Sequence, residues 1–238
     1  MENTQTKIGQ EGDTMNFSYA TRAMNINPDT EQIEKYDEYP TKGSPLQYTF
    51  IFLTVLILGG AIYLFVTGHW ILGIVGVLAT LIFTFLSYAF NSSLRREVAY
   101  KDGLLIPAII TSVSPLEILA LADVSVIETS EPIYGVRKMK VNNLPNQEIV
   151  KGEKVPCAAL FGAGHKGYRR MFEPRPICWG YSDKDLIAQA TQAITEDKPE
   201  GNFDDEWAML SAIEAKYVDI IKDEDLTFFD KDLNLKEI

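Results

Sequence analysis

Residues 46–90 form an apolar stretch that contains no Asp, Glu, Lys or Arg and only one histidine, His69. The hydrocarbon core of a bilayer is about 30 Å thick and takes roughly 20 helical residues to cross. The stretch is therefore too long for one crossing and long enough for two. Its polar interruption, Thr67-Gly68-His69-Trp70, lies near the middle. The sequence thus predicts a transmembrane helical hairpin.

A pair of buried helices in a soluble protein is the alternative interpretation of this stretch. Such helices keep a polar face toward water, and neither half of residues 46–90 has one. Small residues allow two membrane helices to approach closely, although glycine is common in membrane helices in any case. Four glycines are expected to form the packing face of the hairpin: Gly59, Gly60, Gly73 and Gly76.

Basic residues flank the apolar stretch on both sides: Lys35 and Lys42 before it, and Arg95, Arg96 and Lys101 after it. The connector between the two predicted helices carries no Lys or Arg. Because cytoplasmic flanks are enriched in basic residues, both termini are expected in the cytoplasm, with the hairpin in a bacterial inner (plasma) membrane. A long, mostly polar segment precedes the hairpin, which argues against a cleavable signal peptide.

The net charge of −11 is unevenly distributed along the chain. Residues 91–181 contain 12 basic and 9 acidic residues, whereas residues 182–238 contain 6 basic and 16 acidic ones. A basic region next to the membrane suits an anionic cytoplasmic leaflet, so membrane lipid is an expected partner. Nucleic acid is not an expected partner of so acidic a chain.

Residues 91–181 are predicted to form a β-rich cytoplasmic domain. Asp102-Gly103 predicts a tight hairpin turn. Five apolar or alternating runs with turn residues between them predict short strands: 104–113, 117–127, 136–141, 154–161 and 175–179. Short strands at such intervals favour a small antiparallel β-barrel or curled sheet.

Residues 182–222 change to helical spacing. Ser182 and Asp185 resemble a capping box, and Asp204 or Asp205 is expected to begin a second helix. A pair of helices packed on the β-rich part makes the predicted fold class α+β.

The two ends of the chain lack this regular patterning. Residues 1–45 are polar and are predicted to form a disordered cytoplasmic arm. Residues 223–238 form an acidic tail with interspersed apolar residues. The tail is predicted to dock on its own domain, with service as a peptide for a partner as the alternative.

The loop Gly162–Arg170 has the composition of an anion site, since its glycines free backbone amides near basic side chains. It lacks the Gly-Lys-Ser/Thr of a P-loop and any dinucleotide fingerprint. One interpretation is a solvated hairpin loop; the other is a basic surface that contacts acidic lipid or an acidic partner. The predicted members of that surface are Lys138, Lys140, His165, Lys166, Arg169, Arg170 and Arg175.

Cys157, His165 and Cys178 raise the question of a metal site or a nucleophile. Zinc takes four ligands, or three with an open position, and these three residues form no paired motif. No metal or cofactor is therefore predicted. Both cysteines have apolar neighbours and are predicted to be buried, and in a reducing compartment they are not expected to form a disulfide.

The order of several short motifs resembles a bacterial family known only as a domain of unknown function, over roughly residues 50–220. After the helical hairpin these motifs are Gly103-Leu-Leu-Ile-Pro107-Ala, Leu119-Ala-Leu-Ala-Asp123, Gly152-Glu-Lys-Val-Pro156-Cys, Pro174-Arg-Pro176-Ile-Cys-Trp179-Gly-Tyr-Ser-Asp183 and Glu206-Trp207-x-x-Leu210. The resemblance implies a small bacterial membrane protein and assigns no catalytic residue.

The sequence favours a non-catalytic, membrane-anchored interaction or scaffold module, or an accessory subunit of a membrane complex. Its partner would be another membrane or cytoplasmic protein, or a second copy of the chain. Two alternatives from other classes stay open. One is a sensor of a small anion at Gly162–Arg170, and the other is a membrane-tethered hydrolase that uses Cys157 and His165.

Overall fold

The computed structural model describes residues 22–39, 45–89, 92–126, 131–162, 164–165, 167–196, 199, 202–223 and 225–237. The chain divides into two compact units. One is Tyr39–Arg96, and the other combines Met1–Glu38 with Glu97–Ile238.

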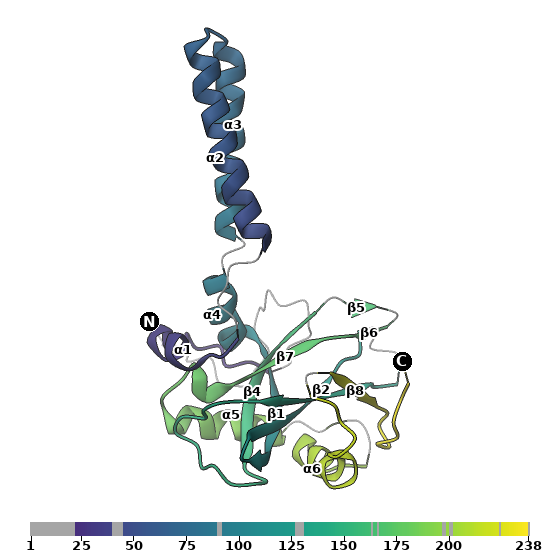
Figure 1. Cartoon of the computed structure of the whole chain (residues 1–238). Coiled ribbons are helices and arrows are strands. Elements are labelled where there is room, and N and C mark those ends of the chain that lie inside the picture. The colour runs from purple at the N-terminus through teal and green to yellow at the C-terminus, as the bar shows by residue number, and fades with distance from the viewer. Residues whose placement is uncertain are drawn as a thin grey trace, which may run out of the picture. The chain divides into compact units, whose positions relative to one another are not determined.

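The first unit is a pair of antiparallel helices, α2 (Pro45–Val66) and α3 (Trp70–Ala89), which lie side by side (Figure 1). Gly68 in the connector has a φ of +82°, a conformation that favours glycine. Both helices are long and apolar enough to cross a membrane, and only 6% of each apolar window is buried. A core helix of a soluble protein would be mostly buried. The predicted hairpin is confirmed, and its exposed apolar surface makes this a membrane-associated protein.

Close packing within the hairpin involves two of the four predicted glycines. A Cβ at Gly73 would lie 2.9 Å from the ring of Phe65, and one at Gly76 would lie 2.8 Å from the Cβ of Ala61. Gly59 and Gly60 have open space around them. The expectation that these two pack within the hairpin is wrong, because they lie on exposed parts of α2.

The second unit is built on a six-stranded antiparallel sheet with the order β7-β4-β1-β2-β3-β8 (Figure 1). The strands are β1 (Leu104–Val113), β2 (Leu116–Asp123), β3 (Tyr134–Lys140), β4 (Lys154–Phe161), β7 (Phe172–Pro176) and β8 (Leu226–Phe229). β5 (Gly164–His165) and β6 (Tyr168–Arg169) form a separate two-stranded ribbon.

The sheet is curled. Arg137 on β3 donates a hydrogen bond of 2.7 Å to the carbonyl of Phe172 on β7, although β4, β1 and β2 separate these strands in the sheet. Only a strongly curved sheet brings the two strands so close. The predicted α+β fold with a curled sheet is confirmed.

Helices cover one face of the central strands. α5 (Lys184–Glu196) packs on β1 and β4, and α6 (Glu206–Tyr217) packs on β1 and β2. Asp205 caps α6 by accepting a 2.7 Å hydrogen bond from the amide of Ala208, as the sequence predicts. The buried face of α6 comprises Trp207, Met209, Leu210 and Ile213.

Two local predictions in this unit are wrong. Asp102-Gly103 is no hairpin turn, because α4 (Ser92–Asp102) is helical up to Asp102 and Gly103 leads directly into β1. The predicted strand 175–179 is displaced: β7 ends at Pro176, and Ile177–Trp179 is a 3-10 turn. In both places a short run of consecutive apolar residues is buried without forming the predicted strand or turn.

The N-terminal segment 22–38 belongs to this unit, so the prediction of a disordered arm over residues 1–45 is wrong for this part. Within this segment, the carbonyl of Arg22 accepts a hydrogen bond from the amide of Leu105, and the amide of Asp29 donates one to the carbonyl of Gly180. It contains α1 (Thr30–Tyr36) and buries Ala23 and Met24 completely. These few apolar anchors and backbone bonds do not produce a periodic pattern. Residues 1–21 and 40–44 lie outside the described residues.

The acidic tail docks on its own domain, as predicted. β8 pairs with β3 in antiparallel register, with Phe229 opposite Tyr134. The chain then turns back, and the amide of Lys236 donates to the carbonyl of Phe228. The hydroxyl of Tyr217 donates to the carbonyl of Leu233 at 2.9 Å. The C-terminal segment thus forms a short hairpin on the outer side of β8.

Candidate functional site

Lys138 and Lys140 on β3 are occupied by the chain's own tail. Their ammonium groups lie 3.1 Å and 2.8 Å from the carboxylate of Asp223. Hydrogen bonds from Lys140 and Lys138 hold the pKa of Asp223 below its ordinary value. This contact fastens the segment before β8, and the side chain of Lys140 is 59% exposed. The contact of these lysines with acidic lipid or an acidic partner stays a prediction.

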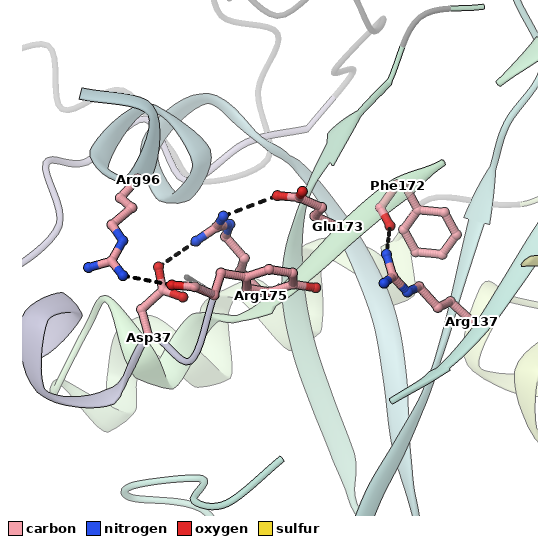
Figure 2. Close-up of polar contacts among 7 residues, drawn as sticks. Asp37, Arg96, Arg137, Phe172, Glu173 and Arg175 are labelled. Carbon is pink, nitrogen blue, oxygen red and sulfur yellow. Dashed lines mark hydrogen bonds and ion pairs between the residues drawn. The ribbon is translucent and has the colours of Figure 1, made fainter. Parts of the chain in front are cut away.

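Arg175 is buried and takes no part in a basic surface (Figure 2). Its guanidinium forms ion pairs with Asp37 and, at 3.1 Å, with Glu173. Burial alone would lower the pKa of Arg175, but Asp37, Tyr100 and Glu173 raise it above its ordinary value. Its predicted surface role is wrong, because β7 directs this side chain toward the N-terminal segment.

The predicted anion loop is the β5–β6 ribbon, in which Gly167 has a φ of +90°. Arg169 is buried, with its guanidinium 5.3 Å from the centre of the Phe161 ring. Burial lowers the pKa of Arg169. Arg170 is exposed. Lys166 and the side chain of His165 lie outside the described residues.

Arg170 lines a groove that the sequence did not predict. The groove has a volume of about 650 Å³ and lies where β6, β8 and the C-terminal segment meet; we call it the β8 groove. In Figure 1 these elements adjoin at the end of the sheet marked by the C terminus. Its lining residues are Tyr168, Arg170, Ile220, Lys222, Asp225, Leu226, Thr227, Phe228, Leu235, Lys236 and Glu237.

The β8 groove combines aromatic and aliphatic surface. The rings of Tyr168 and Phe228 meet edge to face, with centroids 5.5 Å apart. Ile220 is 57% exposed and Leu235 is 48% exposed. α6 ends at Tyr217, and Ile220 lies beyond it, outside the core.

Charged groups line the same groove. Three are basic and two acidic: Arg170, Lys222, Lys236, Asp225 and Glu237. Within the described part of the chain, no ion pair involves any of them. Two other acids of the tail are engaged elsewhere, Asp223 with β3 and Asp230 with the backbone amides of Asp232 and Asn234. The groove therefore offers charge together with exposed apolar surface.

A second groove of about 580 Å³ lies between α5 and the loop before β4. Its walls include Lys184, Thr191 and Lys154, and its one large apolar residue, Ile187, is buried. This surface therefore lacks an exposed apolar anchor among its lining residues. It provides a comparison surface for the β8 groove.

Both cysteines are buried and unbonded, as predicted. Burial, followed by the proximity of Cys178, raises the pKa of Cys157 well above its ordinary value. Burial raises the pKa of Cys178 to about 12. A protonated, inaccessible thiol is a poor nucleophile, so the geometry gives no support to a hydrolase based on Cys157. Among the described residues, no three His, Cys, Asp or Glu side chains are grouped to hold a metal ion.

A family model described as "Protein of unknown function (DUF3239)" matches residues 94–216, about half of the chain. The chain belongs to this family. The family resemblance predicted from the motif order is thereby confirmed. The matched segment spans most of α4 through most of α6 and includes Tyr168 and Arg170, whereas β8 and the C-terminal segment follow it. One wall of the β8 groove thus lies inside the family segment and the other outside it.

One solved structure is similar to this chain: a crystal structure described as that of a "putative membrane protein from Corynebacterium diphtheriae". The two are 24% identical, with a TM-score of 0.42, and the match covers 53% of this chain and 98% of that one. A search of curated proteins found no match.

Proposed function

We propose that this protein is a membrane-anchored interaction module, a scaffold or accessory subunit that holds a partner protein in the β8 groove. The hairpin supplies the anchor and the α+β domain supplies the binding surface. The proposal rests on one observation: the β8 groove exposes Ile220 and Leu235 beside an aromatic pair and charged side chains. No catalytic step is part of this proposal.

The physical support comes from how protein interfaces are built. Apolar side chains at the centre of an interface supply most of the binding energy, and a polar rim supplies specificity. Among the exposed large apolar side chains of this domain, Ile220 and Leu235 line the β8 groove together. A bound partner would remove both from water.

The proposed topology places both termini in the cytoplasm and the hairpin in the bacterial inner membrane. It is supported by Lys and Arg residues on both flanks of the hairpin and their absence from its connector. A Thr67→Cys variant tests it on intact cells with the outer membrane permeabilised. An impermeant maleimide should label the new cysteine, while buried Cys157 and Cys178 give no background. If the maleimide labelled this cysteine only after the inner membrane was opened, the connector would face the cytoplasm and the proposed topology would be wrong.

Site-specific photo-crosslinking tests the interaction. A photoreactive amino acid replaces Thr227, which lines the β8 groove, or Thr191, which lines the second groove. In living cells, Thr227 should give one discrete adduct and Thr191 should not. Mass spectrometry then identifies the adduct, and an adduct with the chain itself would make a second copy the partner. Absence of an adduct at Thr227, or equal adducts at both sites, would contradict the proposal.

A further inference from the structure

We infer that the occupant of the β8 groove is an acidic amphipathic peptide segment, one that carries apolar side chains next to carboxylates. This inference rests on the proposed function and specifies the partner's chemistry. It follows from three features of the groove: the exposed apolar side chains, the balance of charges and the preformed wall.

The apolar features set the first requirement. Leu226 and Phe228 on β8 are half-buried, and Ile220 and Leu235 are exposed beside them. These four side chains and the buried Tyr168 are the apolar and aromatic members of the lining, which also contains five charged residues. Burial of apolar surface stabilises a complex by roughly 25 cal/mol per Å². A partner must therefore present at least one large apolar side chain to the groove.

The charges set the second requirement. Arg170, Lys222 and Lys236 outnumber Asp225 and Glu237 at the groove, on a chain whose net charge is −11. Asp223 is engaged by the β3 lysines, and Asp230 is held by a backbone turn and by its attraction to Lys236. The charged side chains of the lining therefore carry a net charge of +1 on an acidic protein. A carboxylate-bearing partner fits it, and like-charge repulsion disfavours a basic one.

The shape of the groove distinguishes a peptide from a lipid chain. An acyl chain requires a continuous apolar enclosure, whereas charged or hydroxyl-bearing residues make up more than half of this lining. A peptide alternates polar and apolar groups over a few ångströms and matches such a lining. The wall is also in place before binding. Lys236 donates to Phe228 through its amide, and Asn234 donates to Asp230, which closes the turn. Preorganisation of this kind lowers the entropic cost of binding.

Selection from a random peptide library tests the inference with the full-length chain in phosphatidylcholine nanodiscs. A phage-displayed library is first depleted on nanodiscs that hold the Ile220→Ser, Leu235→Ser variant and then captured on the wild-type chain. The enriched peptides should combine carboxylates with apolar side chains. Their affinity should fall as salt rises, since charge pairs at a surface are screened over about 10 Å at 0.1 M ionic strength.

Two charge-reversed variants provide the matched comparison. Arg170→Glu with Lys236→Glu should weaken the selected peptides at least about tenfold, whereas Lys184→Glu at the second groove should leave their affinity unchanged. A basic consensus, or no enrichment over the depleting variant, would overturn the inference. If peptides fail while phosphatidylglycerol added to the nanodiscs protects Leu235→Cys from maleimide labelling, the groove binds lipid instead.

These outcomes are separable from those of the cellular crosslinking. A discrete crosslinked partner together with a basic peptide consensus would keep the proposed function and remove the acidic occupant. Loss of the crosslink would remove the proposed function whatever the library returns.

Discussion

The two edges of the curled sheet differ in the surroundings of their charged residues, which are buried at one edge and line an open groove at the other. At the β7 edge, Arg175 is buried between Asp37 and Glu173, and Pro174 and Pro176 occupy the strand. Proline cannot donate to another strand and is tolerated at an edge. At the β8 edge, Arg170 and Lys236 line an open groove beside exposed apolar residues. Charge at the first edge contacts the chain itself, and charge at the second lines the groove in which we propose that a partner binds.

Arg170 and Arg175 are only five positions apart in the sequence, yet they have different roles. Arg170 and Arg175 are both in the basic run that sequence analysis treated as one surface. Arg170 follows β6 and points to the groove, whereas Arg175 lies within β7 and meets the N-terminal segment. The strands to which they belong place the two side chains in different surroundings. A count of charges along the sequence contains no information about this placement.

The largest predicted effect is at the closed β7 edge. Asp37→Ala leaves the Arg175 guanidinium buried without its main counter-ion and should lower the free energy of unfolding by about 3–5 kcal/mol. Denaturant unfolding of the full chain in detergent, followed by tryptophan fluorescence, measures the loss. Asp37→Ala combined with Arg175→Met removes both charges and should recover much of it. An Asp37→Ala protein as stable as the wild type would show that this edge is not held by the ion pair.

The next effect concerns the attachment of β8. Phe229 is the one fully buried residue of β8, and its ring lies 5.1 Å from that of Tyr217. Phe229→Ala should cost about 2–3 kcal/mol, less than a central core position because the tail can detach locally. Hydrogen exchange should then rise from Leu226 to Lys236. Thr227→Ala, which removes a half-exposed side chain from the same strand, should leave exchange unchanged. Unfolding of the whole domain by Phe229→Ala would mean that β8 belongs to the central core.

Much of the fold follows from the sequence, and the groove does not. The two hairpin helices, β1 and β4 coincide with mainly apolar runs of the sequence, and the structure gives β1 and β4 the predicted bounds. The ordered segment 22–38 was not predicted, because it has few buried apolar residues and its hydrogen-bond partners are backbone groups distant in sequence, such as those of Leu105 and Gly180. The β8 groove escaped because its two walls are separated by about fifty residues. The early end of α6, which exposes Ile220, has no strong sequence signal.

A smaller effect is expected at the contact that precedes β8. Hydrogen bonds from Lys140 and Lys138 lower the pKa of Asp223. The folded protein therefore favours the carboxylate, and this stabilisation is complete above the ordinary value of 3.8 and lost as pH falls through the lowered pKa. Asp223→Asn should lower the protection of the β8 amides from exchange at neutral pH. After correction for the intrinsic exchange rate, protection in the variant should no longer change as pH falls through the acidic range. High salt should have the same effect on the wild type but not on the variant.

The smallest effect on stability is predicted where the effect on binding is greatest. Ile220→Ser with Leu235→Ser alters surface side chains that are 57% and 48% exposed, so the free energy of unfolding should change by less than about 0.5 kcal/mol. The same variant should lose the crosslink formed from Thr227. Unfolding in detergent and crosslinking in cells measure the two quantities on one protein. If stability fell while the crosslink persisted, Ile220 and Leu235 would be core residues of the tail. The β8 edge would then be as closed as the β7 edge, and the contrast between the two edges would disappear.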